Sequence, residues 1–104
     1  MIEWMLNNLA EDLAIEQLSR RALMSTRTFA RRFRAEVGAT PAAWLNTQRI
    51  LRARQLLEES DLGLEQIAHM VGFGTAAVMR HHFLKTLQTT PTSYRRAFGE
   101  RAAG

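Results

Sequence analysis

Four arginines lie within one eight-residue segment of this 104-residue chain, in the sequence "MSTRTFARRFRAEV". They are Arg27, Arg31, Arg32 and Arg34. On a helix, like charges three or four residues apart repel by about 0.2–0.5 kcal/mol per pair. Guanidinium groups bind phosphates and guanine edges through paired hydrogen bonds. The cluster therefore points to a polyanionic partner, and nucleic acid is the first candidate.

The charge of the whole chain agrees with that interpretation. The formal net charge is +4, the sequence pI is about 11.0, and 13 of the 14 basic residues are arginine. A generally basic surface without a specific partner is the alternative, and charge alone does not choose between the two.

His81 and His82 are the other residues whose type could do chemistry, as metal ligands. Adjacent residues on a helix point about 100° apart, and no third ligand is evident. The chain has no cysteine, which excludes disulfides and thiolate zinc sites. It also lacks a phosphate-binding glycine loop, a nucleophile elbow and a spaced Ser/His/Asp set. We therefore expect no enzyme activity, no catalytic residue, no metal and no cofactor.

Length and composition suit one compact domain or two very small ones. Hydrophobic residues make up 46% of the chain and charged residues 23%, which is an ordinary globular mixture. No segment approaches the ~20 consecutive apolar residues of a membrane helix. Glu3, Glu11 and Asp12 make the first segment unlike a signal peptide. We expect a cytoplasmic protein that does not contact a membrane.

Helix signals dominate, and no alternating strand pattern is present. In Thr40-Pro41 and Thr90-Pro91, a capping threonine precedes a proline that suits the first helical position. Gly38 suits the end of the preceding helix. We predict an all-α fold with helices near 2–9, 15–22, 26–37, 41–59, 64–71, 75–87 and 91–98, followed by a frayed tail at 99–104.

The second half of the chain repeats the first. "IEQLSRRALMS" (15–25) is similar to "LEQIAHMVGFG" (64–74), and "FARRF" (29–33) to "MRHHF" (79–83). Glu16 recurs as Glu65 after 49 residues, but Pro41 recurs as Pro91 after 50, so one residue is added between Phe73 and Met79. Each unit contains a short helix, a turn, a longer helix and a proline-started helix.

A short helix, a tight turn and a second helix form a helix-turn-helix, whose second helix can enter the DNA major groove. In the first unit, Ser25 or Thr26 should cap the second helix. Apolar residues should bury one face of each helix, and these are Ile15, Leu18, Ala22, Phe29, Phe33 and Val37. The arginines lie on a different face of the second helix.

The second unit repeats this design with less charge. The residues we expect in its core are Ile67, Met70, Val71, Met79, Phe83 and Leu87. The residues we expect on its outer face are Ala76, Ala77, Arg80, His81 and Leu84. That face offers methyl groups and a few polar groups to base edges.

Residues 67–98, "IAHMVGFGTAAVMRHHFLKTLQTTPTSYRRAF", resemble the C-terminal signature of the AraC/XylS family of bacterial transcription regulators. The resemblance lies in the Ile-Ala, Gly-Phe, spaced aromatic and Thr-Pro…Tyr-Arg elements. The segment "MSTRTFARRFRAEVGATPAAWL" agrees, and the likeness covers residues 4–98. The segments "MSTRTFARRF" and "GFGTAAVMRHHF" are most similar to the subgroup with an N-terminal PfpI-like, glutamine-amidotransferase-type domain.

The resemblance implies sequence-specific binding of double-stranded DNA by two recognition helices, near 26–37 and 75–87, in successive major grooves. It divides the chain into a first helix-turn-helix subdomain (1–40), a linker helix (41–59) and a second subdomain (60–98). The implied partners are duplex DNA on the nucleoid, RNA polymerase, and an N-terminal effector or dimerisation domain outside this chain.

The resemblance also implies which residues contact DNA. The base-contact positions are Arg27, Thr28, Ala30, Arg31, Ala76, Ala77, Val78, Arg80 and His81. The phosphate-contact positions are Ser25, Thr26, Arg32, Arg34, Arg49, Thr75, Lys85, Arg95 and Arg96, and Arg80 is a candidate for either role. The helix N-termini at 41 and 91 should also attract phosphates.

Several positions depart from the family pattern. Ala30, Ala76 and Ala77 replace longer polar side chains, so shape and methyl contacts should matter more there. Leu23 stands in a turn where many members have glycine. Gln88 stands where the first unit has Gly38, so the second recognition helix should end less cleanly.

Alternatives remain for the arginines and for the whole chain. Arg27 and Arg31 could contact phosphates or solvent, and Arg32 or Arg34 could pair with Glu36. A protein-interaction module for an acidic partner and a helix bundle on an anionic membrane also use basic helices. The repeat favours DNA over the first alternative, and the buried role of the phenylalanines favours it over the second.

Overall fold

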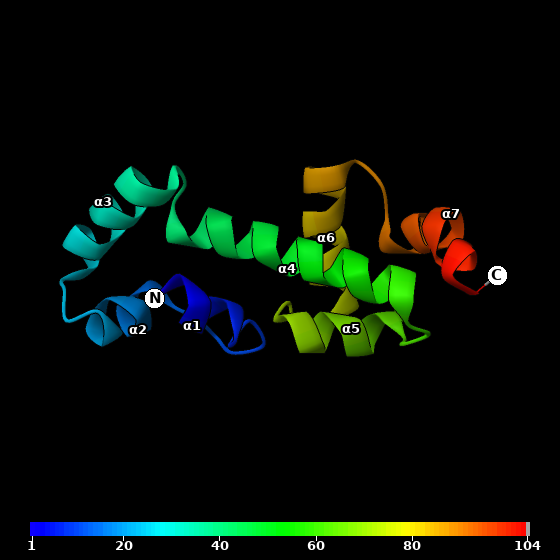
Figure 1. The fold of residues 1–104 in the computed structure, drawn as a ribbon, viewed down its shortest axis with the longest axis horizontal. Coiled ribbons are helices and arrows are strands. Elements are labelled where there is room, and N and C mark those ends of the chain that lie inside the picture. Colours follow the sequence, from blue (N-terminus) through cyan, green and yellow to red (C-terminus); the bar gives the residue numbers. More distant parts are fainter. Residues whose placement is uncertain (104) are drawn as a thin grey trace.

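The computed structural model describes residues 1–103, with side chains through Gly99, and these residues form seven helices (Figure 1). The helices are α1 (Ile2–Leu6), α2 (Ile15–Arg21), α3 (Thr26–Val37), α4 (Pro41–Glu59), α5 (Leu64–Val71), α6 (Ala76–Leu87) and α7 (Pro91–Ala103). The all-α prediction is therefore confirmed. No helix within the described residues is both long and apolar enough to cross a membrane.

Hydroxyl side chains begin the helices at the predicted places. The Thr40 hydroxyl accepts the Ala43 N–H at 3.2 Å, and the Thr90 hydroxyl accepts the Ser93 N–H at 3.1 Å. Ser25 caps α3 by accepting the Thr28 N–H at 3.2 Å. Gly38 ends α3 with φ +89°, which a residue without a side chain adopts most easily.

Four details differ from the sequence prediction. The first helix ends at Leu6 rather than near residue 9, because the Asn8 side-chain amide donates to the Trp4 carbonyl, which a continuing helix would use. Met70 is 42% exposed, and Ala68 occupies the core instead. Gln88 ends α6 cleanly, since it adopts the left-handed φ of +59° that Gly38 provides in the first unit.

The fourth difference concerns the C-terminal end. Helix α7 runs to Ala103, so residues 99–103, expected as part of a frayed tail, are helical. Gly104, the last residue of that expected tail, lies outside the described residues.

The structure also locates the residue that separates the two repeats. Leu23 and Gly72 occupy the same point of the two turns, and both have positive φ values, +58° and +100°. The residue after each, Met24 or Phe73, donates its N–H to a carbonyl five residues earlier. Gly74 is then extra in the second turn, before the cap of α6, within the predicted interval.

The molecule is elongated, 48 × 22 × 21 Å, and holds two hydrophobic cores along the length of α4 (Figure 1). The first core contains Met5, Leu13, Leu18, Phe29, Phe33 and Leu45. The second contains Ile50, Ala53, Leu57, Ile67, Ala68, Val71, Phe73, Met79, Phe83 and Tyr94. Because α4 supplies residues to both cores, it connects the two helix-turn-helix units as a shared structural element.

Candidate nucleic-acid interface

Helix α3 is held to the first core by its aromatic face. Phe29 and Phe33 are 5% and 6% exposed, and the Phe33 ring meets Trp44 edge-on with 5.8 Å between ring centroids. Trp44 is thus part of the apolar packing around the first core. Packing on this side leaves the opposite side of α3 facing outward.

The outward side of α3 carries the predicted DNA contacts. Arg27, Arg31, Arg32 and Arg34 are exposed, whereas Thr28 and Ala30 are half-buried. The Thr28 hydroxyl accepts from the Ser25 hydroxyl at 3.0 Å, so both side chains are held at the start of the helix. The structure therefore presents the four guanidinium groups to solvent on one helix.

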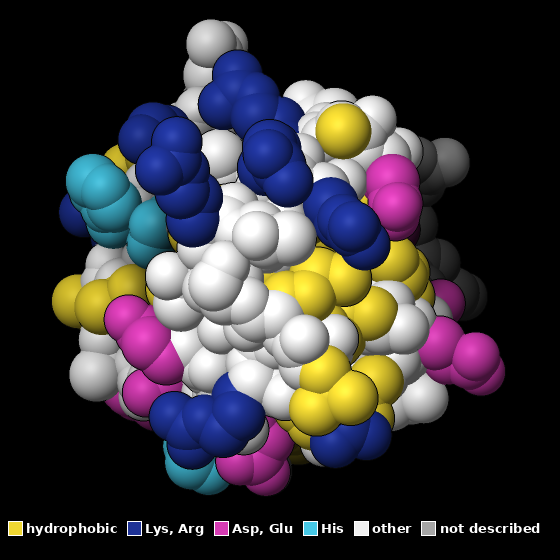
Figure 2. Space-filling model, turned by 90° about the vertical axis from the view of Figure 1, so that its left-hand side faces the viewer, with side chains coloured by type: hydrophobic (Ala, Val, Ile, Leu, Met, Phe, Trp, Pro, Cys, Tyr) yellow, Lys and Arg dark blue, Asp and Glu magenta, His cyan; other side chains and the backbone are white. Residues whose placement is uncertain are grey.

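Figure 2 shows the end of the molecule that α1, α2 and α3 form. Most of the lysine and arginine side chains in this view lie in its upper half, the side on which α3 lies in Figure 1. The acidic side chains lie mainly at the middle and lower edges. In this view the basic side chains are therefore concentrated on the side of α3, with a smaller group at the lower edge.

Helix α6 repeats the arrangement in the second unit. Met79 and Phe83 are completely buried, while Ala77, Val78, Arg80 and His81 are exposed and Ala76 is half-buried. Thr75 caps the helix by accepting the Val78 N–H at 3.2 Å. All of the proposed base-contact positions of this unit lie in the first two turns of α6.

Glu65 is a residue at this interface that the sequence reasoning missed. Its carboxylate accepts the Ala76 N–H at 3.2 Å, from α5 to the first residue of α6. An acidic side chain stabilises a helix N-terminus but repels phosphates. Only the packing of α5 against α6 could reveal this role, because Glu65 and Ala76 are eleven residues apart.

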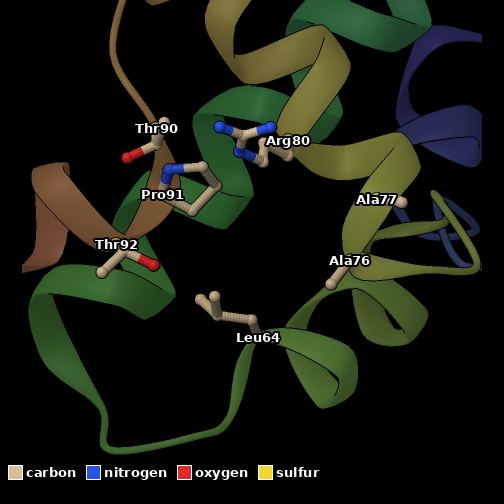
Figure 3. Close-up of a pocket in the computed structure, with 7 residues that line it drawn as sticks. All are labelled: Leu64, Ala76, Ala77, Arg80, Thr90, Pro91 and Thr92. Atoms are coloured by element: carbon tan, nitrogen blue, oxygen red, sulfur yellow. The ribbon is translucent and has the colours of Figure 1, made fainter.

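A cleft of about 320 Å³ opens between α6 and the start of α7 (Figure 3). Ala76, Ala77 and Arg80 line it from α6, and Thr90, Pro91 and Thr92 line it from the other side. The Arg80 side chain extends from α6 toward Thr90 and Pro91. A guanidinium group and a helix N-terminus therefore border the same cleft, and both attract anions.

His82 of α6 is half-buried and stacks on Phe73, with 5.1 Å between ring centroids. Desolvation lowers the pKa of His82, and the nearby positive groups of His81, Lys85 and Arg49 lower it further. Its neutral form is therefore favoured in the folded protein. His81 points outward from the same helix and is exposed.

Two predicted phosphate contacts, Arg49 and Arg95, have hydrogen-bond partners within the protein. Arg49 Nε donates to the Leu9 carbonyl at 3.2 Å, and its Nη2 donates to the Glu11 carbonyl at 3.0 Å. Desolvation lowers the pKa of Arg49, although the charge of Asp12 opposes that shift. These bonds argue against a phosphate role for Arg49.

Arg95 is bound in a similar way at the C-terminal end of α4. Its Nε donates to the Leu57 carbonyl at 3.3 Å, and its Nη2 donates to the Ser60 carbonyl at 3.1 Å. The guanidinium therefore satisfies carbonyl groups at the end of a helix. The other predicted phosphate-contact side chains are exposed, and they are Ser25, Thr26, Arg32, Arg34, Thr75, Lys85 and Arg96.

Comparison with known proteins gives a consistent result. A family described as a helix-turn-helix domain matches residues 18–97. An HTH-type transcriptional regulator of Mycobacterium tuberculosis is 42% identical over 84 residues, which are 81% of this chain and 32% of that protein. The regulatory protein PocR of Salmonella typhimurium is 33% identical over 93 residues, 89% of this chain and 31% of PocR. The chain thus spans about a third of the length of these curated relatives.

A solved structure extends the similarity to three dimensions. The DNA-binding domain of the global transcriptional factor AdpA, crystallised with a target DNA, superimposes with a TM-score of 0.93 and 42% identity. The match covers 98% of this chain and 92% of that domain. The C-terminal domain of AraT, a response regulator from Geobacillus stearothermophilus, has a TM-score of 0.88 and 25% identity, over 91% of this chain and 79% of that domain.

Proposed function

Because the chain belongs to the AraC/XylS family of helix-turn-helix proteins, we propose that it is the DNA-binding domain of a bacterial transcription regulator. It binds specific double-stranded sequences through α3 and α6. The observation that carries this proposal is the duplicated helix-turn-helix. The two units share α4, and each exposes one face of its second helix, α3 or α6, to solvent.

The dimensions of the linker helix support binding of both recognition helices to one duplex. Helix α4 has 19 residues and is therefore about 28 Å long. Successive major-groove segments on one face of DNA are about 34 Å apart. Helix α3 lies beyond the start of α4 and α6 packs against its middle (Figure 1), so the shared helix spaces the two recognition helices along the molecule, as entry into neighbouring grooves requires.

The contacts divide by chemistry. Arg27 and Arg31 read base edges from α3, and exposed arginines such as Arg32 and Arg34 bind phosphates. In the second unit, Ala77 and Val78 offer methyl groups that suit thymine, and His81 offers a polar contact. Arg80 and the start of α7 hold a phosphate at the cleft between them.

The remaining parts of the proposal concern the whole regulator. These relatives are about 2.5 to 3 times as long as this chain, so signal sensing and dimerisation belong to an N-terminal domain of such a regulator. The regulator works in the cytoplasm, on the nucleoid, and contacts RNA polymerase there. The residues of the segments "MSTRTFARRF" and "GFGTAAVMRHHF" favour a PfpI-like domain as this N-terminal domain.

A salt series tests the proposed function. The probes are a duplex selected from a random-sequence library by this chain, a scrambled duplex, and one strand of the selected duplex. Affinity for the selected duplex should fall linearly with salt on a log–log scale, with a slope of about −0.9 per phosphate contacted. The scrambled duplex and the single strand should bind more weakly at every salt concentration.

The competing functions give different results in the same experiment. An interaction module for acidic proteins would not distinguish the selected from the scrambled duplex. A membrane-surface bundle would bind vesicles of anionic lipid and show no preference for duplex over single strand. Either pattern would overturn the proposal.

A further inference from the structure

The two helix-turn-helix units meet at a second point besides the shared helix α4. The segment that follows α1 and the turn that follows α5 come together beside Arg49, at the middle of α4. Figure 1 shows the same approach, where the loop between α1 and α2 points toward the end of α5. We call this the junction, formed by Leu9, Glu11, Arg49 and Gly72.

Arg49 binds the first unit with two hydrogen bonds from one guanidinium. It reaches the Leu9 and Glu11 carbonyls at 3.2 and 3.0 Å, across 40 and 38 residues of sequence. A planar guanidinium holds two acceptors in fixed directions, which the point charge of a lysine cannot do. The α1–α2 segment is thereby fixed to the middle of α4.

Gly72 completes the junction from the second unit. A Cβ at this position would overlap the Leu9 carbonyl oxygen and lie 2.6 Å from Arg49 Nε. At the equivalent turn of the first unit stands Leu23, which is 93% exposed although its φ is also positive. Backbone conformation alone therefore does not require glycine in this turn, but the close approach at the junction does.

We propose that Arg49 is a positioning residue that fixes the distance and angle between α3 and α6, and with them the half-site spacing that the protein accepts. The part of this inference that concerns DNA rests on the proposed function. Arg49 itself contacts no DNA; it acts through the carbonyl groups of the first unit. Without it, the units would be linked chiefly through α4, and each could bend relative to the other.

The geometry can be tested without DNA. The chain has no native cysteine, so Glu36→Cys on α3 and Thr86→Cys on α6 allow two spin labels at exposed positions. We expect one narrow distance distribution in the otherwise unmodified chain and a broader one with Arg49→Ala. Arg52→Ala is the matched control, because Arg52 is exposed and bonds to Gln55 within α4. An Arg49→Ala distribution as narrow as that of Arg52→Ala would overturn the inference.

A second pair of variants disrupts the junction from the opposite side. Gly72→Ala adds both backbone strain and an overlap with Leu9, and should broaden the distance distribution. Gly38→Ala adds the same kind of strain at φ +89°, but a Cβ there meets nothing within 4 Å. It should lower stability and leave the distribution narrow. Equal broadening in the two variants would contradict a specific role for the junction.

Half-site spacing is the functional readout. The probes are the library-selected duplex and versions with one base pair inserted or removed between the two contacted segments. One base pair moves a groove segment by about 3.4 Å and 36°. A change of one base pair in the spacing should lower the affinity of the unmodified chain about tenfold or more, which is the scale of one mismatched base pair. The same change should lower the affinity of Arg49→Ala by a several-fold smaller factor.

These experiments distinguish a failure of the proposed DNA-binding function from a failure of the inference about Arg49. If the unmodified chain does not prefer the selected duplex, the proposed function fails, while the spin-label distances still test the junction. If it does prefer that duplex but Arg49→Ala keeps the full spacing penalty, the inference about Arg49 fails and DNA binding stands.

Discussion

Arginine has two different roles in this protein. The arginines of α3 are exposed to solvent, whereas Arg49 and Arg95 are half-buried and bond to the backbone. On α3 the guanidinium groups face solvent, where a polyanion would neutralise their mutual repulsion. Arg49 and Arg95 each donate two hydrogen bonds to backbone carbonyls that are distant in sequence. A basic residue in this chain is therefore a DNA-contact candidate only where its partners lie outside the protein.

Two substitutions on α3 test the division between base and phosphate contacts. Arg31→Ala should weaken binding to the selected duplex by ~1–3 kcal/mol and relax discrimination at one base position. Arg34→Ala should weaken all sequences alike and reduce the salt slope by about one. Titrations of selected and scrambled duplexes at several salt concentrations measure both effects, and identical behaviour of the two variants would refute the division.

Leu23 gives a prediction about stability at the same scale. A φ of +58° costs a residue with a side chain ~1–2 kcal/mol of stability. The Leu23 side chain is 93% exposed, so it gains little from hydrophobic burial to offset that cost. Leu23→Gly should therefore raise stability by about 1 kcal/mol, after the entropy that glycine adds to the unfolded chain. In a thermal melt this corresponds to roughly 4–8 °C.

Leu23→Ala is the control for that melt. Alanine keeps the Cβ and with it most of the strain, so the melting temperature should change little. A lower melting temperature for Leu23→Gly would mean that the leucine makes a stabilising contact that outweighs the strain.

At the scale of elements, helix ends decide how α4 connects to its neighbours. The Thr40 hydroxyl caps its start, while Arg95 of α7 bonds to the Leu57 and Ser60 carbonyls at its end. Tyr94, also on α7, donates to Glu58 at 2.5 Å and accepts from Arg54 at 3.2 Å. Helix α7 is thus fixed to the last turns of α4 by polar contacts as well as by the second core.

Arg95 and Arg96 form a natural pair for testing this attachment. Arg95→Ala should destabilise the protein by about 1–2 kcal/mol, because two part-buried carbonyl groups lose a charged donor. Arg96→Ala should leave stability nearly unchanged, since Arg96 is exposed, but should lower affinity for any duplex. Denaturant unfolding and duplex titration of both variants provide the measurement. Equal losses of stability would show that the bonds of Arg95 contribute little.

At the scale of the whole molecule, two separate cores are joined by one helix and one junction. The first core holds six buried residues and the second holds ten, so the core of the second unit is better shielded from solvent. The charges are distributed the other way, because α3 carries four arginines and α6 carries one arginine and one lysine. The unit with the more basic recognition helix is therefore the one with fewer buried core residues.

Hydrogen exchange should reveal the two cores as separate units. Phe33→Ala removes an aromatic ring that is 6% exposed and should cost ~3–5 kcal/mol in the first unit. We expect amides of α2 and α3 to lose protection, while those of α5 and α6 keep most of theirs. Equal loss of protection in both units would show that the molecule unfolds as one cooperative body.

Local signals in the sequence were enough to predict the helices, the repeat and the family. Capping threonines, prolines and apolar periodicity act over a few residues, so they predicted the start of α4 at 41 and of α7 at 91. Spacing of four residues likewise indicated which faces of α3 and α6 are buried. The DNA-contact residues stay predictions, because they depend on a partner outside the chain.

Polar contacts between residues far apart in the sequence became visible in the folded structure alone. Arg49 and Leu9 are 40 residues apart, Arg95 and Leu57 are 38, and no local pattern encodes such pairs. The same holds for the hydrogen bond from Ala76, at the start of α6, to Glu65 of α5. It also holds for position 72, where the nearby Leu9 carbonyl explains the need for glycine. Local propensity acts within a turn or two of helix, whereas the relative placement of the two recognition helices depends on contacts that exist only once the chain has folded.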